Sequence, residues 1–373
     1  MTDIKSYIEN NKNEVYELLY DLCHIPAPSH FERERAEYCK RWLDERGARG
    51  VYIDEANNMV FPINCEGSDR ITVIAAHLDT VFPDREPMPY EERDGRVYCP
   101  GVGDDTASVS VLLMTAKYCV ENSVVPEGGI LFVANACEEG LGNLKGTRQI
   151  FRDYGGRVEK FITFDSNDDA ICDTAVGSHR YEVEVATEGG HSFRDFGNRS
   201  AISELSKLIK AIYETKVPVI EGSRTTYNVG IISGGTSVNT IAESAKMLCE
   251  YRSDNVECLE IMEKRFAEIF ASLDEGVKVS VKRIGERPCA KGLDPVKECA
   301  LADSLADIIK SVRGVTVRRE SGSTDCNIPM SLGIPAVCIG VYLGRGAHTR
   351  GEWIEKESML SGMEIAITLV NSL

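Results

Sequence analysis

The chain has 373 residues, of which 43% are hydrophobic and 27% charged, and its formal net charge is −17. That length and apolar content are sufficient for two domains with substantial cores. The acidity and the absence of basic runs argue against nucleic acid or an anionic membrane as a partner. The N-terminus opens a polar amphipathic helix without an apolar signal core, and no apolar run is long enough to span a bilayer.

The 13 cysteines are scattered along the chain without a C-x-x-C pair, and several, such as Cys249 and Cys338, lie inside apolar runs. This pattern is typical of small buried thiols in a reducing compartment, so we expect a cytoplasmic protein. Cys137 directly precedes Glu138, which makes a thiol nucleophile an alternative. A packing role is favoured, because Cys137 continues the apolar run 130–136.

The first half of the chain predicts strands that alternate with helices. Apolar positions recur at helical spacing over 3–22 and 32–47, which indicates two surface helices. The runs typical of buried strands are 71–76, 130–136 and 160–164, and the helical patterns between them cover 107–114 and 144–154. Such alternation predicts a largely parallel sheet covered on both faces.

The middle of the chain has a different pattern. Residues 181–187 alternate apolar and polar side chains with period two, which indicates a sheet with one solvated face. The elements that follow are a helix at about 199–215, strands at 226–232 and 246–251, a helix at about 255–273 and a strand at 277–281. This β-α-β-β-α-β order is that of a ferredoxin-like unit.

From about residue 288 the α/β pattern returns, with a helix near 295–312, a strand at 335–340 and a last helix at 357–371. The predicted fold class is therefore α/β, a mostly parallel-sheet domain interrupted by a smaller α+β insert. We place the first part of the α/β domain at 1–176, the insert at 177–287 and the second part at 288–373.

Five side chains of metal-binding type each follow an apolar run, namely His77, Asp104, Glu139, Asp165 and His348. Because functional residues gather outside the carboxyl ends of the strands in an open α/β sheet, we expect these residues to meet. Two histidines and three carboxylates are about what two divalent metals need when one carboxylate bridges them. The residues thus predict a two-metal hydrolase, with Glu138 beside a ligand as its base.

Each motif by itself has a plainer interpretation. His77 also suits a buried histidine at a strand end, and the pair 104–105 suits the cap of the following helix. The pair 138–139 also suits an acidic loop. Asp79 is useful to the metal interpretation, because a metal-bound imidazole usually donates its other N–H to a carboxylate. The combination of motifs, more than any single one, favours the metal site.

Seven motifs occur in order along the chain: HLDTVF at 77–82, GVGDD at 101–105, EEG at 138–140, GGHS at 189–192, GGTSVNTIA at 234–242, SGSTD at 321–325 and GAHT at 346–349. Together they resemble the metal-dependent exopeptidase and deacylase family that includes peptidase T, acetylornithine deacetylase, succinyl-diaminopimelate desuccinylase and carboxypeptidase G. The resemblance implies that the α/β part is a zinc-hydrolase domain. It also implies that the insert is a lid and dimerisation domain, so we expect a homodimer.

The resemblance also implies roles for the site residues. One metal ion would be held by His77, Asp104 and Asp165, and the other by Asp104, Glu139 and His348. Zn²⁺ is the expected ion, with Co²⁺ or Mn²⁺ as alternatives that such ligands also suit. Glu138 would be the general base on a metal-bound water, and Asp79 would orient His77.

In the insert, His191 would reach the other subunit's site and stabilise the oxyanion, although it also suits a plain glycine-rich loop. Asn239 and Arg252 resemble substrate-contacting positions, and Arg252 equally suits a salt bridge on its strand. The motif 321–325 would present N–H groups to a substrate carboxylate, or form a plain loop. The remaining histidines, expected to be structural or on the surface, are His24, His30 and His179.

The expected substrate depends on Asp165. By resemblance, aminopeptidase-type members such as peptidase T carry Asp at this position, whereas deacylases and carboxypeptidases usually carry Glu. The sequence therefore favours an aminopeptidase for di- or tripeptides, although the segments around His191 and at 138–148 depart from peptidase T. The alternatives are hydrolysis of an N-acyl or N-carbamoyl amino acid, a carboxypeptidase, and a metal-binding protein without catalysis.

Overall fold

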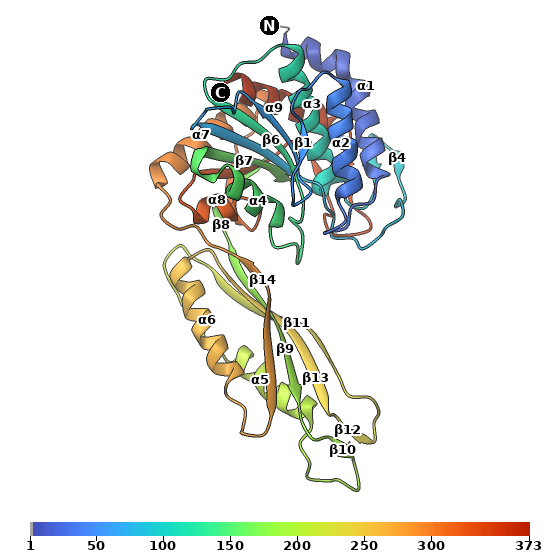
Figure 1. Cartoon of the computed structure of the whole chain (residues 1–373), viewed down its shortest axis with the longest axis vertical. Coiled ribbons are helices and arrows are strands. Elements are labelled where there is room, and N and C mark those ends of the chain that lie inside the picture. Colours follow the sequence, from blue (N-terminus) through green and yellow to red (C-terminus); the bar gives the residue numbers. More distant parts are fainter. Residues whose placement is uncertain (1–2) are drawn as a thin grey trace. The chain divides into compact units, whose positions relative to one another are not determined.

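The computed structural model describes residues 3–373, which form two compact units (Figure 1). One unit contains the chain up to Ala175 together with Lys291–Leu373, and the other is Val176–Ala290. Within the described residues, no helix combines the length and the apolar character that a membrane crossing requires. All 13 cysteines lie in this part of the chain without a disulfide, and every one except Cys299 is buried, as the sequence predicts.

The first unit is built on an eight-stranded sheet in the order β1-β2-β6-β3-β7-β16-β8-β15. Its strands are β1 Tyr52–Ile53, β2 Met59–Ile63, β3 Ile71–His77, β6 Gly129–Asn135, β7 Val158–Ser166, β8 Ala170–Ala175, β15 Arg318–Gly322 and β16 Ala336–Gly340. The adjacent strands β6, β3, β7 and β16 run parallel, and β2 and β8 are antiparallel to them. The predicted mostly parallel α/β fold is confirmed.

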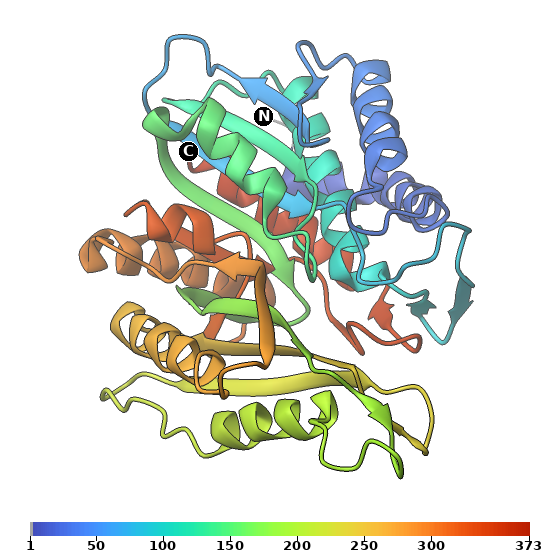
Figure 2. The same ribbon diagram turned by 60° about the horizontal axis from the view of Figure 1, so that its bottom comes forward.

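Helices cover both faces of this sheet (Figures 1 and 2). They are α1 Ile4–Cys23, α2 Arg33–Glu45, α3 Ser108–Glu121, α4 Lys145–Asp153, α7 Pro295–Arg313, α8 Asn327–Ser331 and α9 Ser358–Asn371. Side chains of α1, α2, α3, α7 and α9 share one core with Ile74 and Ile162 of the sheet. Phe151 of α4 packs against Phe161, whose side chain points to the opposite face. Every residue of β3 and β6 is therefore buried.

Several strands of this unit were not predicted. β1, β2, β8 and β15 flank the parallel core, and a small antiparallel sheet has the order β17-β18-β5-β4. Its strands are β4 Glu91–Arg93, β5 Arg96–Tyr98, β17 Gly344–Arg345 and β18 Trp353–Glu355. These segments are two or three residues long, and β4 is exposed throughout. Such short polar strands carry no period-two apolar pattern from which to predict them.

The second unit has a four-stranded antiparallel sheet in the order β11-β13-β9-β14, formed by β9 Gly177–Ala186, β11 Thr225–Gly234, β13 Ser244–Ser253 and β14 Lys278–Arg287. Helices α5 Ala201–Tyr213 and α6 Val256–Phe270 pack on one face, where alternate strand residues such as Val183 and Met247 meet Phe266. A short pair, β10 Gly190–His191 and β12 Thr240–Ile241, completes the unit. The predicted ferredoxin-like element order is confirmed.

Glu298 on α7 gives a testable pH dependence of stability. This side chain is 6% exposed, its Oε2 accepts the N–H of Ala336 at 3.0 Å, and its Oε1 has no hydrogen-bond partner. Burial raises the pKa of Glu298 to about 7. An unfolded glutamate has a pKa of about 4.3, so between these values only the folded state holds the proton, and stability falls as the pH rises.

We therefore expect Glu298→Gln, which carries no titrating proton, to be more stable than the natural chain by roughly 1–3 kcal/mol at about pH 8. At about pH 5 the two proteins should differ by much less, because Glu298 is protonated in the folded state there. Urea unfolding at the two pH values measures this difference. An equal stability difference at both values would contradict the assignment.

Candidate metal centre

The strand ends of the first unit bring the predicted ligands to one edge of the sheet. His77 is the last residue of β3, the pair Glu138–Glu139 follows β6, and Asp165 is the penultimate residue of β7. Asp104 lies in the turn before α3, and His348 lies in the loop after β17. Because β6, β3 and β7 are parallel neighbours, their carboxyl ends lie side by side.

Asp104 stands at the middle of this cluster. Its Oδ1 is 2.9 Å from His77 Nε2, and its Oδ2 is 3.0 Å from His348 Nε2. His77 Nε2 is also 3.8 Å from Asp165 Oδ1, and His348 Nε2 is 3.2 Å from Glu139 Oε1. The two oxygens of one carboxylate thus face two different histidines, which is the arrangement that a bridging ligand requires.

The tautomer of His77 suits a metal ligand. Its Nδ1 lies 2.9 Å from the main-chain carbonyl oxygen of Asp79 and 3.5 Å from Asp79 Oδ1. Because a carbonyl oxygen only accepts hydrogen bonds, Nδ1 carries a hydrogen, and Nε2, which faces the carboxylates, is the nitrogen that a metal ion would use. Both contacts of Nδ1 are with Asp79, and the carbonyl oxygen is the closer of the two.

The donor set fits divalent cations. The ligand atoms of His77, Asp104 and Glu139 lie within 4.8 Å of one another, and so do those of His77, Glu138 and Asp165. Glu139 Oε1 is buried, and the polar atom facing it is His348 Nε2 at 3.2 Å. Burial raises the pKa of Glu139, so gathering these carboxylates is unfavourable without positive charge between them. Imidazole nitrogen with carboxylate oxygen is a donor set that suits Zn²⁺, Co²⁺ or Mn²⁺.

The side chain of Asp79 holds the loop that carries both glutamates. This carboxylate is fully buried, and its Oδ1 accepts the N–H of Glu138 at 3.0 Å. Its Oδ2 accepts the N–H of Glu139 at 3.0 Å and the hydroxyl of Ser29 at 2.6 Å. Although burial opposes it, these bonds and the contact with His77 keep the pKa of Asp79 below its usual range. Asp79 therefore positions Glu138 and Glu139 as well as His77.

Two further acids of the site were not predicted to take part. Asp105 is not the cap of α3, whose N-cap position is Ala107, and its Oδ2 accepts the main-chain N–H of His77 at 2.9 Å. Glu352 is 2% exposed and accepts three main-chain N–H groups of the loop that carries Asp104. In the sequence, only closeness to a predicted ligand could have pointed to these two acids. Asp105 adjoins Asp104, and Glu352 follows His348 by four residues.

The motif 321–325 makes a structural contact through its last residue. Asp325 is fully buried, and its Oδ2 accepts a hydrogen bond from Asn135 Nδ2 at 2.6 Å. Its Oδ1 accepts the hydroxyl of Thr147 on α4. Burial raises the pKa of Asp325 to about 6. The side chain of Asp325 thus ties the end of β6 to α4.

The three predicted substrate-contacting residues all belong to the second unit. His191 is exposed, and its Nδ1 accepts the N–H of Phe193 at 3.2 Å, which leaves the ring hydrogen on Nε2. Asn239 lies in the turn just before β12, where its main-chain carbonyl oxygen accepts the N–H of Ser192 at 3.0 Å. Arg252 forms a two-pronged ion pair with Glu250 at 2.8 and 3.1 Å, the salt bridge that was its alternative interpretation.

The other histidines make local contacts. His24 Nδ1 lies 2.7 Å from the carbonyl oxygen of Tyr20. His179 is buried, its Nδ1 lies 2.6 Å from the Tyr251 hydroxyl, and burial lowers its pKa. His30 Nδ1 is 3.3 Å from the thiol of Cys137.

The contact between His30 and Cys137 bears on the thiol alternative, because a thiol beside an imidazole is the usual form of a cysteine nucleophile. Cys137, however, is fully buried, and its thiol donates to Glu32 Oε1 at 3.2 Å. Burial and the adjacent Glu32 carboxylate raise the pKa of this thiol far above its usual value. A neutral buried thiol is a poor nucleophile, so the packing role is the better supported.

We expect Cys137→Ser to keep activity within about threefold of the natural chain, because the serine hydroxyl also donates to Glu32. Stability should fall by about 1 kcal/mol through altered packing. Steady-state kinetics with urea unfolding measures both quantities, and Cys39→Ser, a buried cysteine of α2, is the matched control. A loss of activity above about 100-fold in a folded, metal-loaded variant would support the thiol mechanism instead.

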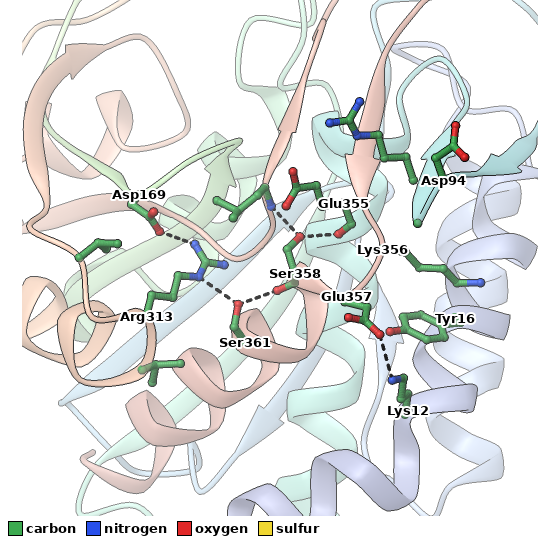
Figure 3. Close-up of a pocket in the computed structure, with 15 residues that line it drawn as sticks. Lys12, Tyr16, Asp94, Asp169, Arg313, Glu355, Lys356, Glu357, Ser358 and Ser361 are labelled. Atoms are coloured by element: carbon green, nitrogen blue, oxygen red, sulfur yellow. Dashed lines mark hydrogen bonds and ion pairs between the residues drawn. The ribbon is translucent and has the colours of Figure 1, made fainter.

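A hollow of about 950 Å³ lies elsewhere on the first unit, and its described lining residues include no member of the metal-ligand cluster (Figure 3). Arg313 Nη1 pairs with Asp169 Oδ1 at 2.6 Å, and its Nε donates to Ser361 Oγ at 3.0 Å. Lys12 pairs with Glu357 at 3.4 Å. These contacts within the hollow join α7 and α1 to α9, which is a structural role.

Comparison with known proteins agrees with this geometry. The family model described as peptidase family M20/M25/M40 matches residues 73–372. A putative succinyl-diaminopimelate desuccinylase, DapE, of Mycobacterium tuberculosis is 24% identical over 362 residues, which cover 95% of this chain and 97% of the relative.

Two solved structures share the fold over almost their whole length. A tripeptidase from Staphylococcus aureus has a TM-score of 0.75 at 22% identity, and the alignment covers 97% of this chain and 99% of that one. The aminopeptidase PepT from Bacillus cereus has a TM-score of 0.72 at 22% identity, with coverage of 96% and 98%. At this identity the likeness establishes the fold.

Proposed function

Because this chain belongs to the peptidase family M20/M25/M40 and is a metal-dependent hydrolase, we propose that it is an aminopeptidase acting on di- or tripeptides. The family resemblance drawn from the seven motifs is thereby confirmed, and the substrate is the proposal. The observation that carries it is Asp165 in the ligand cluster, at the position where the resemblance gives aminopeptidases Asp and deacylases Glu. The fold similarity to a tripeptidase supports the same choice.

We propose that the cluster holds two divalent ions. One would be bound by His77, Asp104 and Asp165, and the other by Asp104, Glu139 and His348, with Zn²⁺ ahead of Co²⁺ and Mn²⁺. When bound, such ions polarise the scissile carbonyl and make water a nucleophile at neutral pH. The position of Asp104 between the two histidines is the main support for this assignment.

Glu138 is proposed as the general base. It takes a proton from the attacking water and returns it to the leaving amine, tasks that need a carboxylate beside the ligands. Its main-chain N–H is held by Asp79 Oδ1, so its position is linked to that of His77. The competing role for Glu138 is direct metal binding, because its ligand atom lies within 4.8 Å of those of His77 and Asp165.

The insert is proposed to serve as lid and dimerisation domain of a homodimer, with His191 acting across the dimer. The tautomer supports this role, because a hydrogen on Nε2 is what a donor to the tetrahedral oxyanion needs. Such a donor contributes on the order of 3 kcal/mol to catalysis. Asn239 and Arg252 are proposed to contact substrate from the same unit, with Arg252 held in place by Glu250.

The action of His191 across the dimer is testable by mixing two inactive chains. We expect a mixture of His191→Ala and Glu138→Ala chains to recover up to about a quarter of natural activity, since half the dimers are mixed and each has one intact site. Analytical separation of mixed dimers with activity assays measures the recovery. Verified mixed dimers without activity would place His191 in its own subunit's site or outside catalysis.

The proposed location is the cytoplasm, because all 13 thiols are free in the described structure and a reducing compartment keeps them so.

The competing activity within the family is hydrolysis of N-acyl amino acids, which similarity to a desuccinylase favours.

The test of the proposed function is cleavage of a free-amine tripeptide and of its N-acetylated twin, with metal content measured alongside. We expect two metal ions per chain and cleavage of the free peptide alone, abolished by a chelator and restored by metal. Cleavage of the acetylated peptide alone would overturn the aminopeptidase and leave a deacylase. No cleavage of either by metal-loaded protein would favour a metal-binding protein without catalysis.

A further inference from the structure

Glu352 is a buried carboxylate whose described hydrogen bonds are all with main-chain N–H groups. It is 2% exposed and lies between His348 and strand β18. Its Oε1 accepts the N–H of Gly103 at 2.9 Å and that of Asp104 at 2.8 Å. Its Oε2 accepts the N–H of Gly101 at 2.6 Å. One buried carboxylate therefore satisfies three main-chain donors of the loop that carries Asp104.

The chemistry of these contacts requires a carboxylate. Both oxygens of Glu352 face N–H donors, and an ionised carboxylate accepts at both of its oxygens. The isosteric amide of glutamine would place an NH₂ group against one of these N–H groups and leave that donor unsatisfied in a buried place. A hydrophobic replacement would leave all three unsatisfied. The loop and the side chain are thus matched in number and kind of polar atoms.

The packing around Gly103 limits movement of the loop. A Cβ at this position would lie 2.9 Å from Glu352 Oε1 and 2.9 Å from both the ring and the hydroxyl of Tyr342. Only glycine lets the main chain approach Glu352 so closely. The loop is therefore fixed by hydrogen bonds on one side and by contact with Tyr342.

We propose that Glu352 is a positioning residue for the metal centre, which holds the loop 101–104 so that both oxygens of Asp104 face the two histidines at once. Since His348 lies on the same short segment, Glu352 links one terminal ligand to the bridging ligand. It would thereby set the spacing of the two ions and the affinity for the second. This inference rests on the proposed two-metal function.

The test compares Glu352→Gln with Glu298→Gln, both purified and loaded with Co²⁺. The control removes a similarly buried carboxylate that also accepts a main-chain N–H, but at the start of β16 and not at the strand ends of the site. Co²⁺ titration gives stoichiometry and affinity, and the visible spectrum of bound Co²⁺ reports coordination geometry. Peptide kinetics on the loaded proteins follow.

We expect Glu352→Gln to bind the second Co²⁺ about 10–100-fold more weakly, as is typical when a partner that orients a ligand is lost. Its Co²⁺ spectrum should change, and kcat should fall with KM less affected. Glu298→Gln should match the natural chain in Co²⁺ affinity, in the Co²⁺ spectrum and in peptide kinetics. If Glu352→Gln fails to fold, Gly103→Ala, which pushes the loop from Glu352 without removing its charge, should give the same changes.

A folded Glu352→Gln or Gly103→Ala variant with natural Co²⁺ stoichiometry, affinity and spectrum would overturn the inference, whatever its thermal stability. Failure of the proposed substrate is distinguishable. A natural chain that binds two Co²⁺ ions and cleaves no peptide would overturn the aminopeptidase, while the Co²⁺ comparison would still decide the role of Glu352. A natural chain that binds fewer than two ions would overturn both.

Discussion

Replacing Glu138 by alanine is expected to lower kcat by roughly 10²–10⁴-fold while two metal ions per chain stay bound. The reason is that proton transfer and metal binding are separate tasks, and the five proposed ligands remain. The main-chain contact of this residue with Asp79 is also kept, because it is made by the N–H group. Metal analysis of the purified variant, together with steady-state kinetics, measures both halves of the expectation.

The matched control is Glu138→Gln, which keeps the size and polarity of the side chain but cannot accept the proton. It should be as inactive as the alanine variant if proton transfer is the lost task. Metal binding by Glu138 is the competing role, since its carboxylate lies within 4.8 Å of the ligand atoms of His77 and Asp165. Loss of one metal ion from Glu138→Ala would reassign this residue as a ligand.

Replacing Asp104 by alanine is expected to remove both metal ions, whereas His348→Ala should remove one. Asp104 has one oxygen 2.9 Å from His77 Nε2 and the other 3.0 Å from His348 Nε2, whereas His348 is a proposed ligand of one ion. Activity should fall by more than about 100-fold in either variant. This loss is larger than the loss typical when a residue that only orients a metal ligand is removed. Metal content after dialysis against buffered Zn²⁺ distinguishes the loss of two ions in Asp104→Ala from the loss of one ion in His348→Ala.

Asp84→Asn is a suitable control for the change in charge, because Asp84 is a nearby surface acid that pairs with Arg350 at 2.6 Å. It should keep two ions. If Asp104→Ala lost only one ion, Asp104 would be an ordinary ligand of a single metal. If it kept two, the site would lie elsewhere.

Buried acids around the ligands share one mode of action. Asp79, Asp105 and Glu352 each accept main-chain N–H groups of residues that carry ligands or lie beside them. Asp79 and Glu352 thereby fix loops, and Asp105 fixes the end of β3. Such loops have no regular hydrogen-bond partners of their own, and a buried N–H left unpaired would be costly. The net charge of −17 thus includes acids that serve the interior as well as the surface.

Much of the architecture was determined by local sequence. The apolar runs of β3 and β6 predict strands buried on both faces, and the alternation in β9 predicts one solvated face. Parallel strands end at one edge, so ligand-type residues placed after each strand are expected to meet there. For this reason the amino-acid sequence alone predicts that His77, Glu139 and Asp165 lie at one edge of the sheet.

Only the tertiary structure decided how those residues are held. Asn135 and Asp325 are 190 residues apart in the chain, and Gly101 and Glu352 are 251 apart, so no local pattern relates them. The motif around His77 predicted a side-chain partner in Asp79, but the path of the main chain brings the carbonyl oxygen closer and turns the carboxylate to the loop of Glu138. Spacing along the chain predicts the proposed ligands, because strand ends converge. The groups that orient them are selected by which buried donors remain unpaired after folding, and that is a property of the folded chain.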